Sequence, residues 1–504
     1  MRKTKYNKLE VGNAIGIPFG ILLNIFFHVQ TGIGQDWGRY WCFGDSAGID
    51  FADVNNPITF QSEMDCSESC ASVGDSVNGL LMYAHTDYWP LWIAGYNRTT
   101  VVHNKFHQIM FNGDSLVGNA FHSGISILPK PGNDSVFYLF QWGFRPDSGL
   151  FYSIIEPYFN NGMGRVTQKN VQLLLSRNHL QGGVITCKHG NGKDWWIIVR
   201  NGYAVSNTFN LFLLTSDTLL GPIEQIVGTV TNTDVGMISI SKQGDKIVLV
   251  NQNGLIETYS FNRCSGIIDN AETFSGVPNR SYFGCEFSPS GNVLYVANTN
   301  NIFGNDSLSL YQFDLTQPNP GNTIQVIYQQ PVPASGGLLK RGPDDKIYFT
   351  CLDRCGWPYF DTCRTVYNEN LGVINQPDSL GAACNFAPFS FYLGGKRTYW
   401  NLPNNPNYLL GPLAGSSCDS LSTSMASIEE QESFRVFPNP STGQLYIVRQ
   451  NPEGMTGRLY QCDLKLVREF WVEGMVSGVD LSGLGNGVYI LELDNVRTKV
   501  ILSR

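Results

Sequence analysis

One pattern occurs three times in this chain: Ile238-Ser-Ile-Ser-Lys-Gln-Gly-Asp-Lys-Ile-Val-Leu-Val250, Glu286-Phe-Ser-Pro-Ser-Gly-Asn-Val-Leu-Tyr-Val296 and Leu338-Leu-Lys-Arg-Gly-Pro-Asp-Asp-Lys-Ile-Tyr-Phe349. Each copy has a strand-forming segment, a polar turn with Gly or Asp, and a second segment rich in Val, Ile, Leu and Tyr. Gly and Asp tolerate the positive φ of a hairpin turn, and β-branched and aromatic residues suit a half-buried pleated surface. The pattern therefore predicts an antiparallel hairpin in each copy.

Fainter copies extend the pattern toward the N-terminus, and the first two copies continue into a further strand with period-2 alternation at residues 255–261 and 308–315. Successive turns are separated by 47 to 60 residues, near the roughly 40–50 residues of a propeller blade. We therefore predict an all-β protein, a β-propeller of six or seven four-stranded blades, with turns at Gly79, Gly132, Gly192, Gly244, Gly291 and Asp345.

The blade count stays open between six and seven. Residues 371–402 offer material for a seventh blade, closed by a strand from residues 40–60, which would protect the sheet edges at both chain ends. A helical solenoid would need 3.6-residue periodicity, which we find only around residues 166–180.

Composition supports a packed, folded protein. The 504 residues include 42% hydrophobic and 15% charged residues, and the net charge is −8. A nucleic-acid-binding protein would need a basic footprint, so we expect no nucleic-acid partner.

The N-terminus is typical of a signal peptide. Arg2, Lys3, Lys5 and Lys8 precede an interrupted apolar stretch at residues 14–29, which is too short to span a membrane as a helix. We expect residues 1–35 to be the signal peptide, residues 36–410 to form the propeller, and no transmembrane segment in the mature chain.

The C-terminal region has a different character. Residues 411–433 are small, polar and then acidic, which is a linker composition. Residues 434–504 are rich in strand-forming segments and predict a small C-terminal β-sandwich.

The tail resembles the type A sorting domain of type IX secretion, found on exported proteins of Bacteroidetes bacteria. The matching segments are Phe434-Arg-Val-Phe-Pro-Asn-Pro-Ser-Thr-Gly443, Leu481-Ser-Gly-Leu-Gly-Asn-Gly-Val-Tyr-Ile-Leu491 and Lys499-Val-Ile-Leu-Ser-Arg504. Lys465 departs from the family, which usually has a glycine there. The resemblance implies recognition by the type IX secretion machinery, a secreted or cell-surface location, and a sorting signal made of Pro438, Asn439, Pro440, Gly443, Gly487, Tyr489, Lys499 and Arg504.

The body resembles secreted Bacteroidetes proteins with WD40-like propellers. The matching segments are Trp41-Cys-Phe-Gly44, Gly48-Ile-Asp-Phe51, Gly372-Val-Ile-Asn375 and Leu402-Pro-Asn404. This resemblance implies architecture and compartment, and it implies no chemistry.

Cysteine spacing suggests local disulfides. In an oxidising compartment, cysteines close together in the sequence predict disulfides across loops. The paired CxxC knuckles of a zinc site are absent. We expect no metal site; the disulfide candidates are Cys66, Cys70, Cys351, Cys355 and Cys363.

No catalytic motif is found. The chain lacks a Gly-x-Ser-x-Gly elbow, and His103-x3-His107 lacks the glutamate of a zinc protease because position 104 is Asn. The nearby His85 and His122 add no recognisable ligand pattern, so loop or core positions are favoured over a metal site.

Two aromatic loops are the remaining candidates for binding. Exposed rings beside Pro can stack on sugars or anchor a protein partner, although packing between blades would equally use such rings. The candidate binding residues are Trp89, Trp92, Trp357 and Tyr359.

These observations favour a non-catalytic binding or adhesion module that needs no cofactor. Its ligand, a glycan or a protein, would bind on the loop face or at the channel mouth, because such faces are rigid scaffolds with variable loops. The alternative is a secreted propeller hydrolase acting on polysaccharide or peptide, which an acid pair with shifted pKa at the channel mouth would favour.

Overall fold

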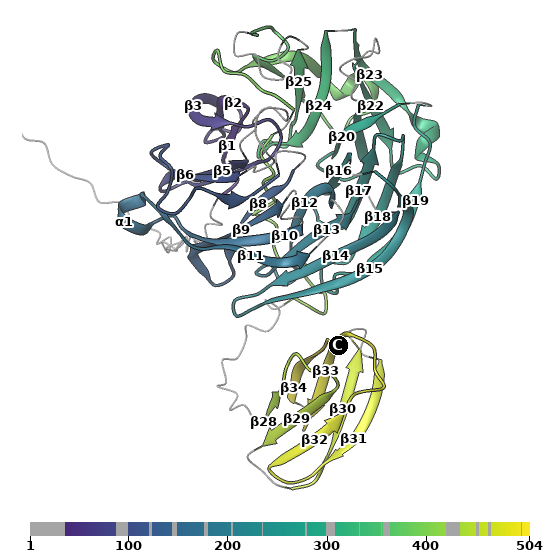
Figure 1. Cartoon of the computed structure of the whole chain (residues 1–504). Coiled ribbons are helices and arrows are strands. Elements are labelled where there is room, and N and C mark those ends of the chain that lie inside the picture. The colour runs from purple at the N-terminus through teal and green to yellow at the C-terminus, as the bar shows by residue number, and fades with distance from the viewer. Residues whose placement is uncertain are drawn as a thin grey trace, which may run out of the picture.

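The computed structural model describes residues 36–503 apart from short segments, and its regular structure is almost entirely β-strand (Figure 1). The predicted signal peptide, residues 1–35, lies outside the described residues. The other segments outside the description are 87–98, 120–122, 144–148, 176–179, 203–204, 234, 278–279, 299–307, 332, 354, 356–362, 401, 420–433, 450–452, 462–464, 495 and 504.

Seven antiparallel sheets follow one another around a central axis and form a β-propeller (Figure 1). Within the described residues, blade 1 has three strands and blades 2 to 7 have four each, always in chain order. Blades 1 to 3 are β1 (Tyr40–Phe43), β2 (Asp45–Asp50), β3 (Ile58–Asp65); β4 (Cys70–Asp75), β5 (Gly79–Thr86), β6 (Thr99–Asn104), β7 (Leu116–Val117); and β8 (Ile125–Lys130), β9 (Asn133–Gly143), β10 (Gly149–Glu156), β11 (Arg165–Leu175). Blades 4 and 5 are β12 (Leu180–Lys188), β13 (Trp195–Asn201), β14 (Ser206–Leu214), β15 (Leu219–Thr231); and β16 (Gly236–Ile240), β17 (Lys246–Asn251), β18 (Ile256–Phe261), β19 (Ile268–Thr273). Blades 6 and 7 are β20 (Tyr282–Phe287), β21 (Val293–Asn298), β22 (Leu308–Asp314), β23 (Gln325–Gln330); and β24 (Ala334–Arg341), β25 (Ile347–Asp353), β26 (Asn370–Ile374), β27 (Phe386–Tyr392).

The first strands of successive blades lie side by side around the axis. In the turn after each first strand, one residue has a positive φ, which glycine adopts without a steric penalty. We call the end of the propeller that carries these turns the turn face. The φ values are 59° at Gly44, 74° at Gly79, 75° at Gly132, 72° at Gly192, 71° at Gly244, 71° at Gly291 and 62° at Asp345. All six turn positions expected from the sequence are therefore first turns, and Gly44 supplies the seventh.

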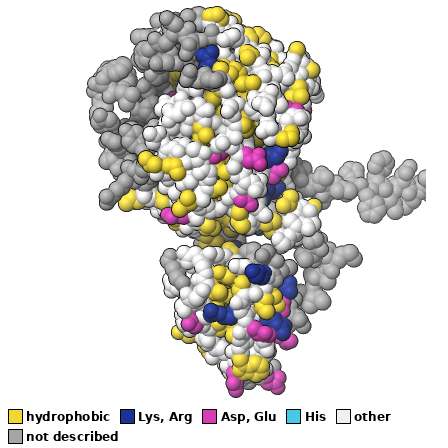
Figure 2. All heavy atoms as spheres, turned by 90° about the vertical axis from the view of Figure 1, so that its right-hand side faces the viewer, with side chains coloured by type: hydrophobic (Ala, Val, Ile, Leu, Met, Phe, Trp, Pro, Cys, Tyr) yellow, Lys and Arg dark blue, Asp and Glu magenta, His cyan; other side chains and the backbone are white. Residues whose placement is uncertain are grey.

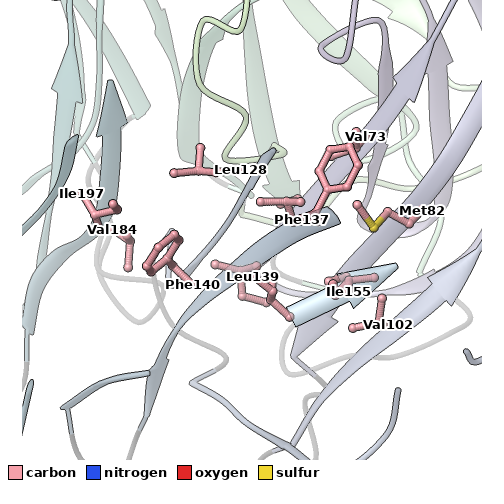
Figure 3. Packing of buried hydrophobic residues seen from close by; sticks show 14 of the residues in the cluster. Val73, Met82, Val102, Leu128, Phe137, Leu139, Phe140, Ile155, Val184 and Ile197 are labelled. Carbon is pink, nitrogen blue, oxygen red and sulfur yellow. The ribbon is translucent and has the colours of Figure 1, made fainter. Parts of the chain in front are cut away.

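Apolar side chains from neighbouring blades fill the spaces between the sheets. Figure 3 shows one such cluster, in which Val73 and Met82 of blade 2 face Phe137 and Leu139 of blade 3. These side chains are almost wholly buried. Because each blade covers its neighbours, the ring has a continuous apolar interior.

Blade 1 closes the ring against blade 7. The ring of Trp41 lies 5.5 Å from that of Tyr348 on β25, and Phe51 lies 5.7 Å from the same tyrosine. Arg397, after β27, is buried, and its Nε donates to Asp45 Oδ2 at 3.0 Å. Residues 40–65 thus form a blade of their own, whereas residues 371–402, expected as seventh-blade material, contribute β26 and β27 to blade 7 and then leave it.

After blade 7, the chain runs back through the propeller channel. We call residues 398–418 the channel strap. The backbone oxygen of Trp400 accepts hydrogen bonds from Leu338 N at 2.9 Å and Thr350 Oγ1 at 2.8 Å in blade 7. Asn404 N then donates to Cys70 O of β4 at 2.8 Å, and Tyr408 OH donates to Ile127 O of β8 at 2.7 Å.

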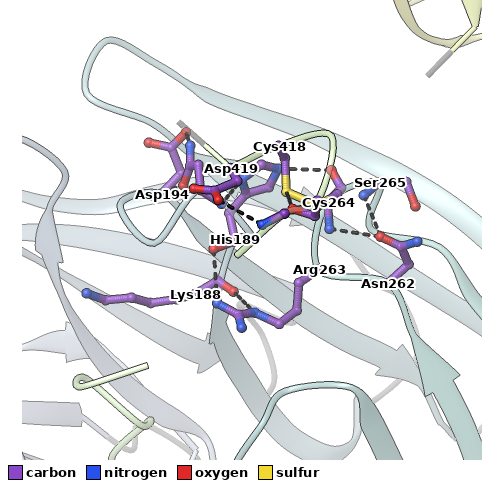
Figure 4. Close-up of a disulfide and its surroundings, with 12 residues drawn as sticks. Lys188, His189, Asp194, Asn262, Arg263, Cys264, Ser265, Cys418 and Asp419 are labelled. Carbon is purple, nitrogen blue, oxygen red and sulfur yellow. Dashed lines mark hydrogen bonds between the residues drawn. A yellow bond between two sulfur atoms is a disulfide. The ribbon is translucent and has the colours of Figure 1, made fainter. Parts of the chain in front are cut away.

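The strap leaves the channel at the turn face, where a disulfide fixes it (Figure 4). Cys418 is bonded to Cys264 in the turn between β18 and β19 of blade 5, across a sequence separation of 154. Arg263 Nη2 donates to Gly411 O at 2.6 Å. A Cβ on Gly190 would lie 2.3 Å from Cys418 Sγ, so the disulfide needs glycine at that position. Residues 411–419, expected as the start of a linker, are therefore held against blades 4 and 5.

Helical structure is minor in the described residues. It comprises α1 (Phe159–Gly162) and the 3₁₀ turns η1 (Pro320–Thr323) and η3 (Gly381–Cys384). The 3.6-residue periodicity around residues 166–180 does not correspond to a helix, because residues 165–175 form β11, which pairs with β10.

The C-terminal unit is the expected small β-sandwich. Its two sheets are β28–β29–β32 and β31–β30–β33–β34. Leu445, Leu459 and Leu491 belong to the apolar cluster between them. The strands are β28 (Phe434–Phe437), β29 (Gln444–Arg449), β30 (Met455–Gln461), β31 (Leu466–Val472), β32 (Val476–Asp480), β33 (Gly487–Leu493) and β34 (Val496–Leu502).

The cysteines differ in part from the expected pattern. Cys355 and Cys363 form a disulfide, whereas Cys66, Cys70 and Cys351 are buried thiols. The Cys66 thiol donates to Ser69 O at 3.0 Å. Cys70 is the first residue of β4 and pairs with His85 of β5. The pair Cys264–Cys418 was not anticipated, because spacing along the chain cannot reveal so distant a partner.

The two disulfides should differ in what they contribute. We expect the double variant Cys264→Ser/Cys418→Ser to lose on the order of 5 kcal/mol of unfolding free energy, and Cys355→Ser/Cys363→Ser about half of that, because closing a longer loop restricts the unfolded chain more. Denaturant unfolding of both variants, followed by tryptophan fluorescence, measures the difference. If Cys264→Ser/Cys418→Ser lost less unfolding free energy than Cys355→Ser/Cys363→Ser, the strap would not stabilise the ring as described.

Candidate functional site

A cavity of about 470 Å³ opens on the turn face, on the axis of the ring. Its walls come from the first strands of blades 1 and 4 to 7, from the residues just before blade 1, from the first turns of blades 5 to 7, and from the strap. The apolar part of the lining includes Trp41, Ile185, Ile238 and Leu410. The cavity therefore combines side chains from the start and the end of the propeller sequence.

The strap makes the cavity asymmetric. Asn404 Nδ2 donates to Ile125 O of blade 3 at 2.9 Å and to Val184 O of blade 4 at 2.7 Å. Ser72 N of blade 2 donates to Asn405 Oδ1 at 3.1 Å. The strap thus bonds to the inner strands of blades 2 to 4 and, at Leu338, to that of blade 7, while side chains from the inner strands of blades 4 to 7 line the cavity beside it.

Two of the carboxylates in the lining are held by cations. Glu286 Oε2 accepts a hydrogen bond from Arg341 N at 3.2 Å, and its Oε1 accepts one from Ser239 Oγ at 3.2 Å and faces Arg341 Nη1 at 3.5 Å. Lys242 Nζ lies 2.7 Å from Asp345 Oδ2 and bridges the turns of blades 5 and 7. Basic and acidic side chains are also intermixed over the face drawn in Figure 2.

Asp36 and Lys340 are the other ionisable groups in the lining. Burial raises the pKa of the Asp36 carboxyl, although Arg39 acts against this shift. Burial also lowers the pKa of the Lys340 amine, although Glu286 favours its charged form. Among the described residues, Lys340 takes part in no ion pair or hydrogen bond.

The predicted binding residues cannot be placed in this site. Trp89, Trp92, Trp357 and Tyr359 all lie outside the described residues. Of their surroundings, the structure describes the Cys355–Cys363 disulfide that flanks the second loop. Asp353 lies near these two sulfurs, but a disulfide leaves no thiolate to bind a metal ion.

The histidines of blade 2 are stacked in the fold. The ring of His103 lies 4.8 Å from that of Tyr83 and 5.3 Å from that of His85. His103 lies on β6 and His107 in the following turn, so the two do not share a helix face. Burial lowers the pKa of His85 to about 3 and that of His103 to about 4. The two rings are therefore neutral at ordinary pH.

The expected sorting residues organise the C-terminal sandwich. Asn439 Nδ2 donates to Lys499 O at 2.6 Å and its Oδ1 accepts from Ile501 N at 2.8 Å, so the Pro438–Pro440 loop is tied to β34. Gly443 O accepts from Leu481 N at 2.6 Å, and Tyr489, which is buried on β33, donates to Gly485 O at 2.8 Å. Gly487 begins β33, the Lys499 side chain is exposed, and Arg504 lies outside the described residues.

Residues 435–503 match the family model of the secretion system C-terminal sorting domain. The C-terminal sandwich is a type IX secretion sorting domain. The chain is therefore exported, to the cell surface or the medium, and the domain implies interaction with the type IX secretion machinery. No helix in the described part of the chain is long and apolar enough to cross a membrane.

Structural neighbours of the whole chain are distant. A proposed 6-phosphogluconolactonase from Bacteroides fragilis has a TM-score of 0.43 and 10% identity, over 73% of this chain and 96% of that one. Hsv2 from Kluyveromyces lactis has a TM-score of 0.37 and 10% identity, over 67% and 89%. The β-propeller domain of Cps50 (Swd1) from Myceliophthora thermophila has a TM-score of 0.36 and 10% identity, over 62% and 91%. No curated protein matches the sequence. These likenesses carry no argument about function.

Sequence reasoning missed Lys340 and Asn405 as site residues. A signal for Lys340 was present: Ser239, Glu286 and Lys340 each precede the turn residue of their blade by five positions. Such polar residues on an inner strand indicate a surface that faces the channel. No comparable signal exists for Asn405, because the strap has no repeat.

The buried histidines should make stability depend on pH. Unfolded imidazoles take up protons near pH 6.5, whereas folded His103 does so only near pH 4, so stability should fall as the pH is lowered between these values. We expect His103→Gln to make this fall shallower, and His107→Gln, which keeps both buried rings, to leave it steep. Urea unfolding at several pH values between about 4.5 and 7.5 tests this. If the unfolding free energy depended equally on pH in the wild-type protein, His103→Gln and His107→Gln, the buried histidines would not be the cause.

Proposed function

We propose that this exported propeller is a non-catalytic binding module whose ligand occupies the cavity on the turn face. The strap supports this proposal, because it fills one side of the channel and leaves one recess open on the other. The recess has the size of a small-molecule site, since ligand pockets usually measure about 300–1,000 Å³.

The lining has the composition of a binding site. Aliphatic side chains lie beside amide and hydroxyl groups, including Ser241, Gln243 and Asn407. Such a mixture buries the apolar parts of a ligand while a few polar groups fix its orientation. These residues lie in the first turn of blade 5 and on the strap, both held by a closed ring, so the site is largely preformed.

A hydrolase is the second candidate, but the state of the carboxyl groups in the lining argues against it. Glycoside hydrolysis needs two carboxyl groups with separate acid and base or nucleophile roles. In the lining, Glu286 and Asp345 are engaged with Arg341 and Lys242, and Asp36 has a raised pKa. One carboxyl group with a raised pKa does not make such a pair.

The test is binding of the purified exported protein to an array of glycans and peptides, with each bound compound then followed for cleavage by mass spectrometry. Ser239→Phe places a large ring in the cavity, and Ser216→Phe makes the same change in the exposed turn between β14 and β15. We expect binding without cleavage, loss of binding in Ser239→Phe, and normal binding in Ser216→Phe.

Two results would overturn the proposal. Cleavage of a bound compound would make the protein an enzyme. Binding that survives in Ser239→Phe would move the site away from the cavity, with the aromatic loops around Trp89 and Trp357 as the next surface to change.

A further inference from the structure

The inner strands of blades 5, 6 and 7 present three polar side chains at equivalent positions. Ser239, Glu286 and Lys340 lie on β16, β20 and β24, each five residues before the turn residue, and all three line the cavity. They therefore form an arc on the wall that the strap leaves open.

Only one charge on this arc lacks a partner among the described residues. Glu286 is engaged by Ser239 and Arg341, and the neighbouring cation Lys242 is engaged by Asp345. Lys340 makes no such contact, and it is half-buried in the wall. A desolvated ammonium group that forms no ion pair or hydrogen bond is unfavourable, so an anion in contact with it would be stabilising.

A second group of the lining, on the strap, lacks an acceptor among the described residues. Asn405 of the strap lines the cavity with a side chain that is only 6% exposed. Its Oδ1 accepts from Ser72 N, but its Nδ2 donates to no described residue. Buried amide groups are nearly always hydrogen-bonded, so this donor also points to a ligand with acceptor atoms.

We propose, on the basis of the binding function above, that the ligand is an acidic oligosaccharide whose carboxylate or sulfate group is held by Lys340. The ammonium group supplies a charge-assisted hydrogen bond, and the Asn405 amide supplies a neutral one. Two further side chains of the lining can accept from ring hydroxyls: Gln243 Nε2 donates to Pro289 O at 2.8 Å and Asn407 Nδ2 to Lys242 O at 3.0 Å, and their amide oxygens keep acceptor capacity.

The burial of Lys340 agrees with this assignment. Desolvation lowers the pKa of its amine in the absence of a ligand. An anion in the cavity favours the protonated form and so acts against this shift. Glu286, which favours protonation, and Arg341, which opposes it, are the charged groups that act on Lys340.

The experiment compares matched ligands that differ in charge. Oligogalacturonate is set against its methyl ester, and a sulfated heparin oligosaccharide against its desulfated form, each titrated into the exported protein by calorimetry. We expect one acidic member to bind more tightly than its neutral counterpart. Lys340→Met should weaken that binding about tenfold or more, and Lys340→Arg should retain most of it. Lys193→Met, which removes a charge from the exposed turn before β13, should bind normally.

The outcomes separate the two proposals. The carboxylate and sulfate pairs tell which anion is recognised. Neutral glycans that bind as well as acidic ones, with binding blocked by Ser239→Phe, would overturn the acidic ligand and keep the cavity. An acidic peptide that binds through Lys340 while no acidic glycan does would overturn the sugar assignment. Absence of any binding that Ser239→Phe can block would overturn both proposals.

Discussion

The hydrogen bonds of Asn404 are the constraint on which the rest of the molecule depends. Its backbone NH bonds to Cys70 O of blade 2, and its side-chain NH₂ bonds to Ile125 O of blade 3 and Val184 O of blade 4. One residue near the end of the propeller thus joins three blades formed early in the chain. A segment so bonded occupies the channel, and its position decides which inner strands remain open to solvent.

The properties of the candidate site follow from that position. The strap bonds to carbonyl groups on the inner strands of blades 2 to 4 and to Leu338 N of β24, and side chains of β16, β20 and β24 beyond these bonds line the cavity. Most charges in this wall are paired, and Lys340 is left without a partner among the described residues. The disulfide Cys264–Cys418 then holds the strap at the turn face, just before the chain continues toward the sorting domain.

The sequence indicated the repeated parts of this structure and missed the unique ones. Turn positions such as Gly244 and Gly291 could be predicted, because a positive φ after each first strand demands Gly or Asp and so repeats along the chain. The sorting domain could be recognised because Asn439 and Tyr489 make contacts that its fold requires. The strap resembles a linker in composition, since its bonds come from Asn side chains and backbone groups that carry no periodicity. The free amine of Lys340 could not be inferred either, because pairing of neighbouring charges depends on contacts between blades.

Hydrogen–deuterium exchange of Leu338 and of residues 398–411 in the intact exported protein tests whether the strap occupies the channel. Amides held in the channel exchange only when the ring opens. The backbone NH groups of Leu338, Trp400 and Asn404 donate to strap or blade carbonyls. We therefore expect them to be protected about as strongly as the amides of β12 and β16. Exchange of Trp400 and Asn404 at the rate of an exposed loop, with β12 and β16 still protected, would show that the strap does not occupy the channel.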